Sequence, residues 1–244
     1  MNLKTDHIGD IVAEDFRTSE VFRKHGMDFC CNGNNTIEQQ CEEKGINAEE
    51  VFRDLENLPK SGGGSSVDFR SWPLDLLADY IEKTHHRYAN EKIPVIQGYL
   101  DKIAQVHGNH HPELFEIKEL FNENARDFAM HMKKEELMLF PFIRQMVKAK
   151  TSGSSLKQPH FETVENPVNM MMHEHTEQGE RFEKMQKLSD NYTTPQDGCN
   201  TYRVTYEMLR EFDEDMHTHI HLENNILFPK AVEMEKTIPE SQRI

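Results

Sequence analysis

The chain has 244 residues and carries 43 acidic against 28 basic side chains, which gives a formal net charge of −15 at pH 7. So acidic a protein repels the phosphate backbone of nucleic acids, and no apolar run approaches the ~20 residues that a membrane helix needs. We therefore expect neither a nucleic-acid partner nor a membrane span. The start, MNLKTDHIGD, lacks the basic and apolar parts of a secretory signal, so a cytoplasmic location is expected.

The first 58 residues form a block that contains two adjacent cysteines, Cys30 and Cys31. Neighbouring cysteines close only a strained, easily reduced disulfide, which suits a redox or metal-transfer role; two reduced thiols are the alternative. A thiolate near a helix start would have a lowered pKa. Cys41 is either a third member of this group or a core residue. Cys199 stands at the start of a later helix and is expected to be inert.

A polar stretch containing KSGGGSS separates this block from the rest and predicts a flexible linker over residues 59–70. Beyond it, apolar residues recur at helical spacing, and polar loops separate the helices predicted at 72–107, 112–148, 161–189 and 198–235. Pro94 is expected to kink or break the first of these helices. The prediction is an all-α protein, with a small helical N-terminal domain over 1–58 and an antiparallel four-helix bundle over 71–238.

The bundle half contains an internal repeat. Residues 127–141 read DFAMHMKKEELMLFP and residues 215–229 read DMHTHIHLENNILFP, and both fit D-x3-H-x3-E-x3-L-F-P. The repeat pairs His131 with His219 and Glu135 with Glu223. A further histidine precedes each copy: His85 lies 46 residues before His131, and His175 lies 44 residues before His219. Each half therefore contributes two histidines and one glutamate.

Helical phase predicts which of these side chains face the core. At about 100° per residue, His219 and Glu223 share an apolar face, whereas His217 and His221 fall on the opposite face, toward solvent. The same count turns His86 away from the core. Six side chains are predicted to meet inside the bundle: His85, His131, Glu135, His175, His219 and Glu223. A separate stretch, VHGNHHP, holds three histidines expected to be solvated or to lie near a bundle entrance: His107, His110 and His111.

Four imidazoles and two carboxylates in one core predict a pair of transition-metal ions. Buried unpaired carboxylates are very costly, and a metal supplies the compensation. The set is too large for tetrahedral zinc and too rich in nitrogen for calcium or magnesium. If both glutamates bridge, each ion has two histidines and two carboxylate oxygens, and an oxo or hydroxo bridge would leave one position open. Iron or manganese fits, with iron preferred. Asp127 and Asp215, one turn before two of the histidines, either orient those rings or are solvated surface acids.

These motifs resemble the hemerythrin-like superfamily and, more closely, its repair-of-iron-centres branch. The resemblance covers about residues 5 to 230 and rests on His85, HMKKEELMLFP, Glu174–His175, HIHLENNILFP and the block FRKHGMDFCCNGNNTIEQQCEEKGI. The third helix of hemerythrin carries H-x3-H, but here Gly179 stands four residues after His175. This departure favours the repair branch over an oxygen carrier.

The resemblance implies a di-iron protein of the oxidative and nitrosative stress response that helps restore damaged iron–sulfur clusters, by iron donation or redox activity. It further implies two bridged iron ions as the cofactor, damaged iron–sulfur proteins as clients, and a homodimer. Cys30 and Cys31 are then candidate redox or transfer groups, and Glu174 is a candidate gating carboxylate. Two alternatives stay open: a di-iron reductase of nitric oxide or peroxide, and a hemerythrin-like sensor that binds O2 or NO.

Overall fold

The protein is helical throughout the part that the computed structural model describes, residues 2–58 and 67–243. No strand forms within these ranges; extended backbone pairs only at two isolated bridges, His7 with Thr36 and Leu156 with Arg243. The all-α prediction is confirmed. Of the predicted linker, residues 59–66 lie outside the described ranges. No helix among the described residues is long and apolar enough to cross a bilayer.

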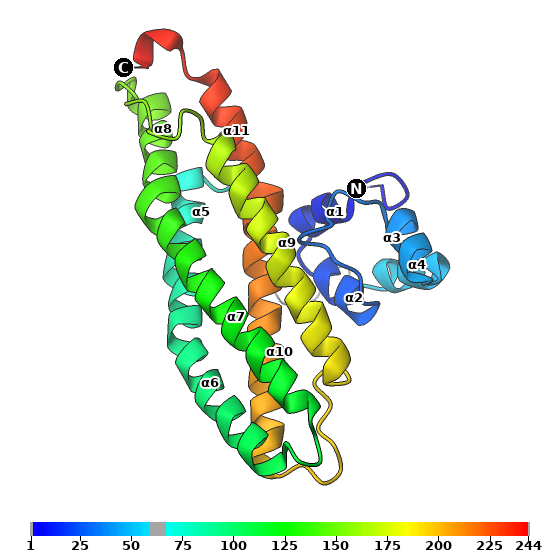
Figure 1. The fold of residues 1–244 in the computed structure, drawn as a ribbon. Helices are drawn as coiled ribbons and strands as arrows, with labels where there is room; N and C mark the ends of the chain where they lie inside the picture. The colour runs from blue at the N-terminus through cyan, green and yellow to red at the C-terminus, as the bar shows by residue number, and fades with distance from the viewer. Residues whose placement is uncertain (1, 59–66, 244) are drawn as a thin grey trace.

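Four long helical rods lie side by side and form the bundle (Figure 1). The first rod comprises α5 (Leu74–Ile81), the π-helical turn η2 (Glu82–His86) and α6 (Arg87–His107). The second comprises α7 (Glu113–Lys134), the π turn η3 (Glu135–Leu139) and α8 (Phe140–Ser152). The third is α9 (Glu165–Leu188), and the fourth comprises α10 (Asn200–Leu222), the π turn η4 (Glu223–Leu227) and α11 (Phe228–Thr237). These rods match the predicted helices closely, and α6 continues through Pro94 without a break.

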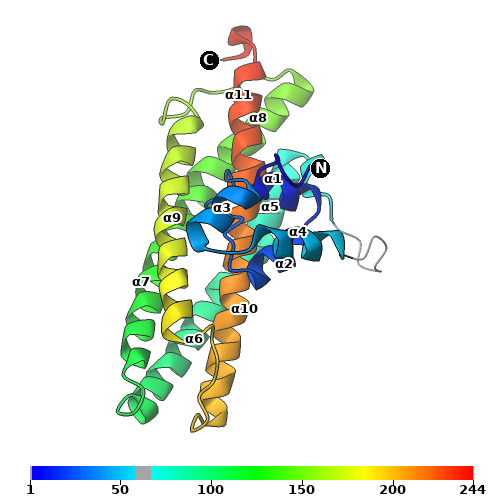
Figure 2. The ribbon, with the colours of Figure 1, turned by 90° about the vertical axis from the view of Figure 1, so that its right-hand side faces the viewer.

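Four short helices form the N-terminal block: α1 (Ile8–Glu14), α2 (Thr18–Lys24), α3 (Ile37–Lys44) and α4 (Ala48–Glu56). Thr36 begins α3 with a reciprocal capping box to Gln39, and Asn47 caps α4, so both helix starts are fixed by the sequence. The block packs against the side of α10 (Figure 2), and Ile220 of α10 belongs to its apolar cluster. Short 3-10 turns, η1 (Phe69–Ser71) and η5 (Glu240–Gln242), flank the bundle.

Two of the π turns occupy equivalent places in the internal repeat, and each ends at the leucine of Leu-Phe-Pro. Pro141 and Pro229 have no backbone N–H, and a proline ring inside a helix clashes with the carbonyl four residues earlier. Those carbonyls belong to Leu137 and Asn225, within η3 and η4. A π turn relieves the conflict because its hydrogen bonds span five residues. The repeated proline therefore explains why Glu135 and Glu223 each begin a widened turn.

The bundle interior contains two apolar clusters, one toward each end of the rods. Phe128 and Met216 belong to one, and Leu139 and Ile226 belong to the other. Along α7–η3 and α10–η4, the repeated histidine and glutamate fall between these cluster residues. Apolar packing on both sides thus encloses a polar layer in the middle of the bundle.

Candidate metal centre

Six ionisable side chains meet in this polar layer, and all are fully buried: His86, His131, Glu135, His175, His219 and Glu223. They form two groups of four, within each of which the potential ligand atoms lie within 4.8 Å of one another. The first group is His86, Glu135, His219 and Glu223, and the second is His131, Glu135, His175 and Glu223. Both glutamates belong to both groups, as two ions sharing two bridging carboxylates would require.

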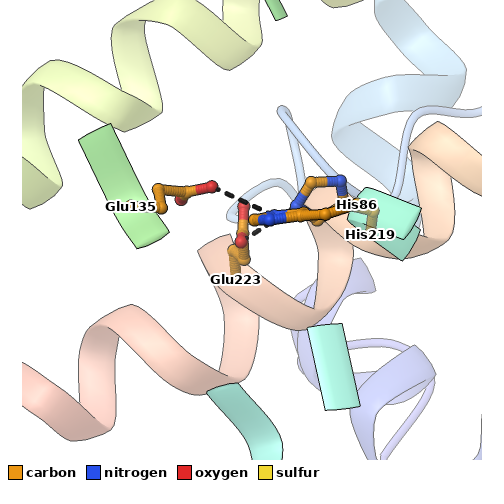
Figure 3. Close-up of side chains that lie close together, drawn as sticks. All are labelled: His86, Glu135, His219 and Glu223. Atoms are coloured by element: carbon orange, nitrogen blue, oxygen red, sulfur yellow. Dashed lines mark ion pairs between the residues drawn. The ribbon is translucent and has the colours of Figure 1, made fainter. Parts of the chain in front are cut away.

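In the first group the imidazole rings approach the carboxylates through Nε2 (Figure 3). The Nε2 atom of His86 lies 3.3 Å from Glu135 Oε2, and that of His219 lies 2.9 Å from Glu223 Oε1. These side chains come from η2, α10 and the two π turns that begin with glutamate. Three separate rods are therefore needed to assemble this group.

The second group repeats the arrangement with the other oxygen of Glu223. The Nε2 atom of His131 lies 3.4 Å from Glu135 Oε2, and that of His175 lies 3.2 Å from Glu223 Oε2. The two Nε2 atoms are 3.0 Å apart. Each glutamate thus faces one histidine of each group, and all four rings direct the same nitrogen inward.

Hydrogen bonds at Nδ1 hold three of the four rings from outside: His86 to Glu136 (3.1 Å), His131 to Glu174 (2.9 Å) and His175 to Asn224 (2.8 Å). Such outer partners fix the ring orientation of metal-binding histidines and leave Nε2 free to coordinate. Glu136, Glu174 and Asn224 therefore orient three of the four imidazole rings toward the centre of the layer.

The buried carboxylates give this layer negative charge that bound cations would neutralise. None of the four carboxylate oxygens of Glu135 and Glu223 has a hydrogen bond within the described residues. Burial raises the pKa of Glu135, as does repulsion from Glu223, but His131 and His86 outweigh both and hold it below its usual value. Burial lowers the pKa of His131, yet the carboxylate of Glu135 raises it to about 10. Two ionised carboxylates in full burial, beside four imidazoles, fit transition-metal ions by charge and by donor type.

Comparison with known proteins agrees with this chemistry. Residues 77–231 match the family model described as "Hemerythrin HHE cation binding domain", and residues 4–59 match ScdA_N, described as "Domain of Unknown function (DUF542)". The iron-sulfur cluster repair protein YtfE of Pectobacterium carotovorum is 31% identical over 240 residues, covering 96% of this chain and 100% of the relative. The chain belongs to the ScdA/YtfE family of hemerythrin-like proteins. The iron-sulfur cluster repair protein ScdA of Staphylococcus haemolyticus is 28% identical over 223 residues, 91% of this chain and 96% of the relative. The family resemblance seen in the motifs is confirmed.

The structure places His86 in the candidate metal-binding layer, where the sequence analysis had placed His85. The cause is the π turn η2. A hydrogen-bonded span of five residues puts His86, and not His85, over the buried Ile81. His85 instead bonds through Nδ1 to Asp215, 2.9 Å away, and stacks on His219 with ring centroids 5.7 Å apart. A phase count that assumes a regular α-helix cannot detect this shift.

The outer carboxylates also differ from the expectation. Asp127 lies away from the layer and pairs with Arg181 at 2.8 Å, so it does not orient His131. Glu174 does so instead, and it also accepts a hydrogen bond from Lys134. The hydrogen bond from His131, together with the hydrogen bond and positive charge of Lys134, outweighs burial and lowers the pKa of Glu174 to about 2. Asp215 contacts His85 rather than His219.

The prediction that His217 and His221 face solvent is wrong, because the N-terminal block covers this side of α10. His221 is fully buried beside Phe29, with ring centroids 5.7 Å apart, and burial lowers its pKa to about 4. Nδ1 of His217 lies 2.7 Å from Asp213 Oδ1. Burial lowers the pKa of His217, but this carboxylate outweighs burial and raises it to about 9. Neither ring belongs to the two candidate metal-binding groups.

Asp28 organises the loop that carries the two cysteines. Its carboxylate accepts hydrogen bonds from the backbone N–H groups of Cys30, Cys31 and Asn32 at 2.9 to 3.1 Å. The loop precedes α3 by several residues and is not a helix start. Burial and the neighbouring thiol and carboxylate raise the pKa of Cys30 well above its usual value. The expected low-pKa thiolate is therefore wrong for Cys30. Cys41 is buried in the N-terminal apolar cluster.

This loop directly contacts the candidate metal-binding layer. The thiol of Cys31 lies 3.4 Å from the backbone oxygen of His175, and Asn224 bonds both to the ring of His175 and, at 3.3 Å, to the backbone oxygen of Cys30. Gly179 permits the approach, because a Cβ there would come within 3.2 Å of Cys31 Sγ. The position where hemerythrin carries a further histidine is thus occupied from outside by a cysteine.

Proposed function

We propose that this protein binds two iron ions in its bundle and helps to repair damaged iron–sulfur clusters. The observation that carries the proposal is the pair of four-residue groups that share both of their glutamates in full burial. Each ion would receive two imidazole nitrogens and two carboxylate oxygens, a donor set that suits iron. The relatives named for iron–sulfur cluster repair support the use to which this centre is put.

The proposed ligands are the six residues of the two groups, with His86 replacing His85. When bound, the iron pair supplies electrons or iron to the damaged cluster. The protein's own groups hold the rings and carboxylates in place: Glu136, Glu174 and Asn224 each fix one imidazole through Nδ1. Metal binding requires neutral histidines, so proton release from His131 accompanies loading at neutral pH.

We propose two routes between this centre and its surroundings. Glu174 and Lys134 line a surface pocket of about 230 Å³, and Glu174 is hydrogen-bonded to His131, so displacement of Glu174 would loosen one proposed ligand. The second route passes Cys30 and Cys31. The thiol of Cys31 contacts the backbone of His175, and Asn224 connects the ring of His175 to the backbone of Cys30. Iron or electrons that leave the centre on this side would first meet these thiols.

The wider organisation is also a proposal. The matches at 4–59 and 77–231 support an N-terminal domain over 1–58, a linker over 59–70 and a bundle over 71–238. All four cysteines are free, which suits a reducing compartment such as the cytoplasm.

Val95, Tyr99 and Val106 expose one apolar face of α6, a candidate surface for a homodimer. Light scattering of the purified protein would test the dimer.

The repair proposal is tested with an iron–sulfur enzyme inactivated by nitric oxide. The iron-loaded protein, prepared with a labelled iron isotope, is incubated anaerobically with this client and a reductant. Recovery of client activity is expected for the wild type and not for Glu223→Gln, whereas His173→Gln, an exposed neighbour outside both groups, should match the wild type. Label in the repaired cluster indicates iron donation, and recovery without label indicates redox repair. No recovery with the loaded wild type would contradict the proposal.

The same geometry supports a second candidate function, reduction of nitric oxide. Each group offers four protein donors, which would leave coordination positions open on a bound transition-metal ion, and the two groups adjoin closely enough for two small ligands to meet. Under anaerobic turnover with a reductant, a reductase would release nitrous oxide. Its absence would rule out this candidate without affecting the repair assay.

A further inference from the structure

A second cluster of reactive side chains lies at the far end of the bundle, where α6, α7 and α10 meet their loops. Cys199 is the residue before α10 and is exposed. The metal-binding His219 is 20 residues further along the same helix, about 30 Å away at 1.5 Å per residue. This thiol is therefore remote from both the metal-binding layer and the Cys30–Cys31 loop.

Cys199 is not a lone thiol. Its Sγ lies 3.2 Å from Nε2 of His107, the last residue of α6. Cys199 is also the N-cap residue of α10, and the backbone N–H groups of Tyr202 and Thr201 in the first turn of this helix favour the anionic form of its thiol. These N–H groups and then His107 lower the pKa of the thiol to about 7.

Neighbouring groups hold this arrangement in place. The ring of Tyr202 contacts both histidines, with ring centroids 5.4 Å from His107 and 5.6 Å from His111. Nε2 of His111 bonds to Asp197 at 3.0 Å, and its Nδ1 bonds to Glu113 at 3.1 Å. The loop before α10, which carries Asp197, is thereby tied to the loop after α6, so that Cys199 stays opposite His107.

We propose that Cys199 is a thiol-modification site, with His107 as its base, that takes low-molecular-weight disulfides. Cys199 gives its proton to Nε2 of His107, and the thiolate attacks one sulfur of the disulfide. The Sγ–S bond forms as the S–S bond of the reagent breaks, and the leaving thiolate takes the proton back from His107. One disulfide is consumed and one mixed disulfide forms, so no other oxidant is required. This proposal differs from the expectation from sequence that Cys199 is inert.

The expected rate advantage is modest and measurable. At pH 6 a thiol with a pKa of about 7 is ~9% ionised, against ~0.3% for an ordinary cysteine with a pKa of about 8.5. The more acidic thiolate is the weaker nucleophile, by roughly 5-fold over this interval. The net expectation is about a 6-fold faster reaction than that of an unstructured thiol. Burial raises the pKa of Cys30 and Cys41, so both should react slowly.

The test exposes the iron-loaded full-length protein to 2-hydroxyethyl disulfide at pH 6 and follows each cysteine by peptide mass spectrometry. Cys199 should form its adduct about 6-fold faster than the same cysteine in a peptide of residues 195–204, and Cys199→Ser should lose the adduct. His107→Gln should slow the reaction at least twofold, whereas His110→Gln, an exposed loop neighbour, should not. Equal rates in wild type and His107→Gln, or a rate no higher than the peptide's, would overturn the proposal. The iron content of each variant should match the wild type.

Discussion

The choice between His85 and His86 gives a sharp test of the proposed metal centre. The two residues are adjacent and both are buried, but only the Nε2 atom of His86 faces Glu135. His85 bonds to Asp215 on the outer side of the same turn. Glutamine fills a similar volume and keeps a hydrogen-bonding side chain, so His85→Gln and His86→Gln form a matched pair.

The magnitude follows from the number of donors. Loss of an outer-shell partner typically lowers metal affinity 10- to 100-fold, so loss of a ligand should cost at least ~100-fold at the affected subsite. The other group keeps His131, His175 and both glutamates. His86→Gln should therefore bind about one metal ion where the wild type binds about two. At a metal concentration of 100 Kd for the wild type, the stabilisation from this subsite should fall from about 2.7 to about 0.4 kcal/mol.

The assay is metal content after anaerobic desalting, combined with unfolding at fixed free iron. Both variants are first unfolded without metal, so that any intrinsic loss of stability is subtracted. His85→Gln should keep the wild-type metal ratio and the wild-type gain in stability. Equal metal loss in both variants, or loss in His85→Gln alone, would refute the assignment based on the π turn.

Three further outcomes are expected. Asn224→Ala removes the hydrogen bond to the ring of His175 and should therefore lower metal affinity 10- to 100-fold. Competition with a chelator measures this affinity, and an unchanged value would show that packing alone fixes the ring. Stability of the metal-free protein should fall as pH rises from 6.5 through 9, because the folded state holds protons on His217 and His131 that the unfolded chain has already lost. His217 should account for about 3 kcal/mol of the loss, so His217→Gln should lose about that much less than the wild type while the part due to His131 remains; equal pH profiles in the two proteins would contradict this. Gly179→Ala should push the thiol of Cys31 away from the backbone of His175 by a few tenths of an ångström. The alkylation rate of Cys31, followed by peptide mass spectrometry, should change, while the metal content of the protein should not. An unaltered rate would mean that the loop absorbs the added methyl group.

Helical spacing was enough to predict the architecture. Each long rod carries apolar residues at 3.6-residue intervals over several turns, and a pattern of that length forms a helix in nearly any packing context. The repeat D-x3-H-x3-E-x3-L-F-P identified two of the four histidines and both glutamates, because residues four apart share a face and both copies give the same answer. His175 follows from the same logic on α9, which the structure describes as a regular helix.

Local departures from α-helical geometry are not visible in such a count. The turn η2 displaces the register by one residue and exchanges His85 for His86. Leu-Phe-Pro signals the corresponding turns in the repeat, where the absent N–H of proline explains them, but the sequence around η2 carries no proline at the matching position.

The sequence by itself determined the helices, the repeat and the kinds of donor available, since these depend on residues close together in the chain. Only the tertiary structure decided what covers each face. His221 is polar and out of phase with the core, yet the N-terminal block buries it, and Glu174 rather than Asp127 holds His131. Cys199 acquires its base only because α6 ends beside the start of α10, 92 positions away in the chain. Contacts of this kind depend on how separate helices pack, and no periodicity within one helix encodes them.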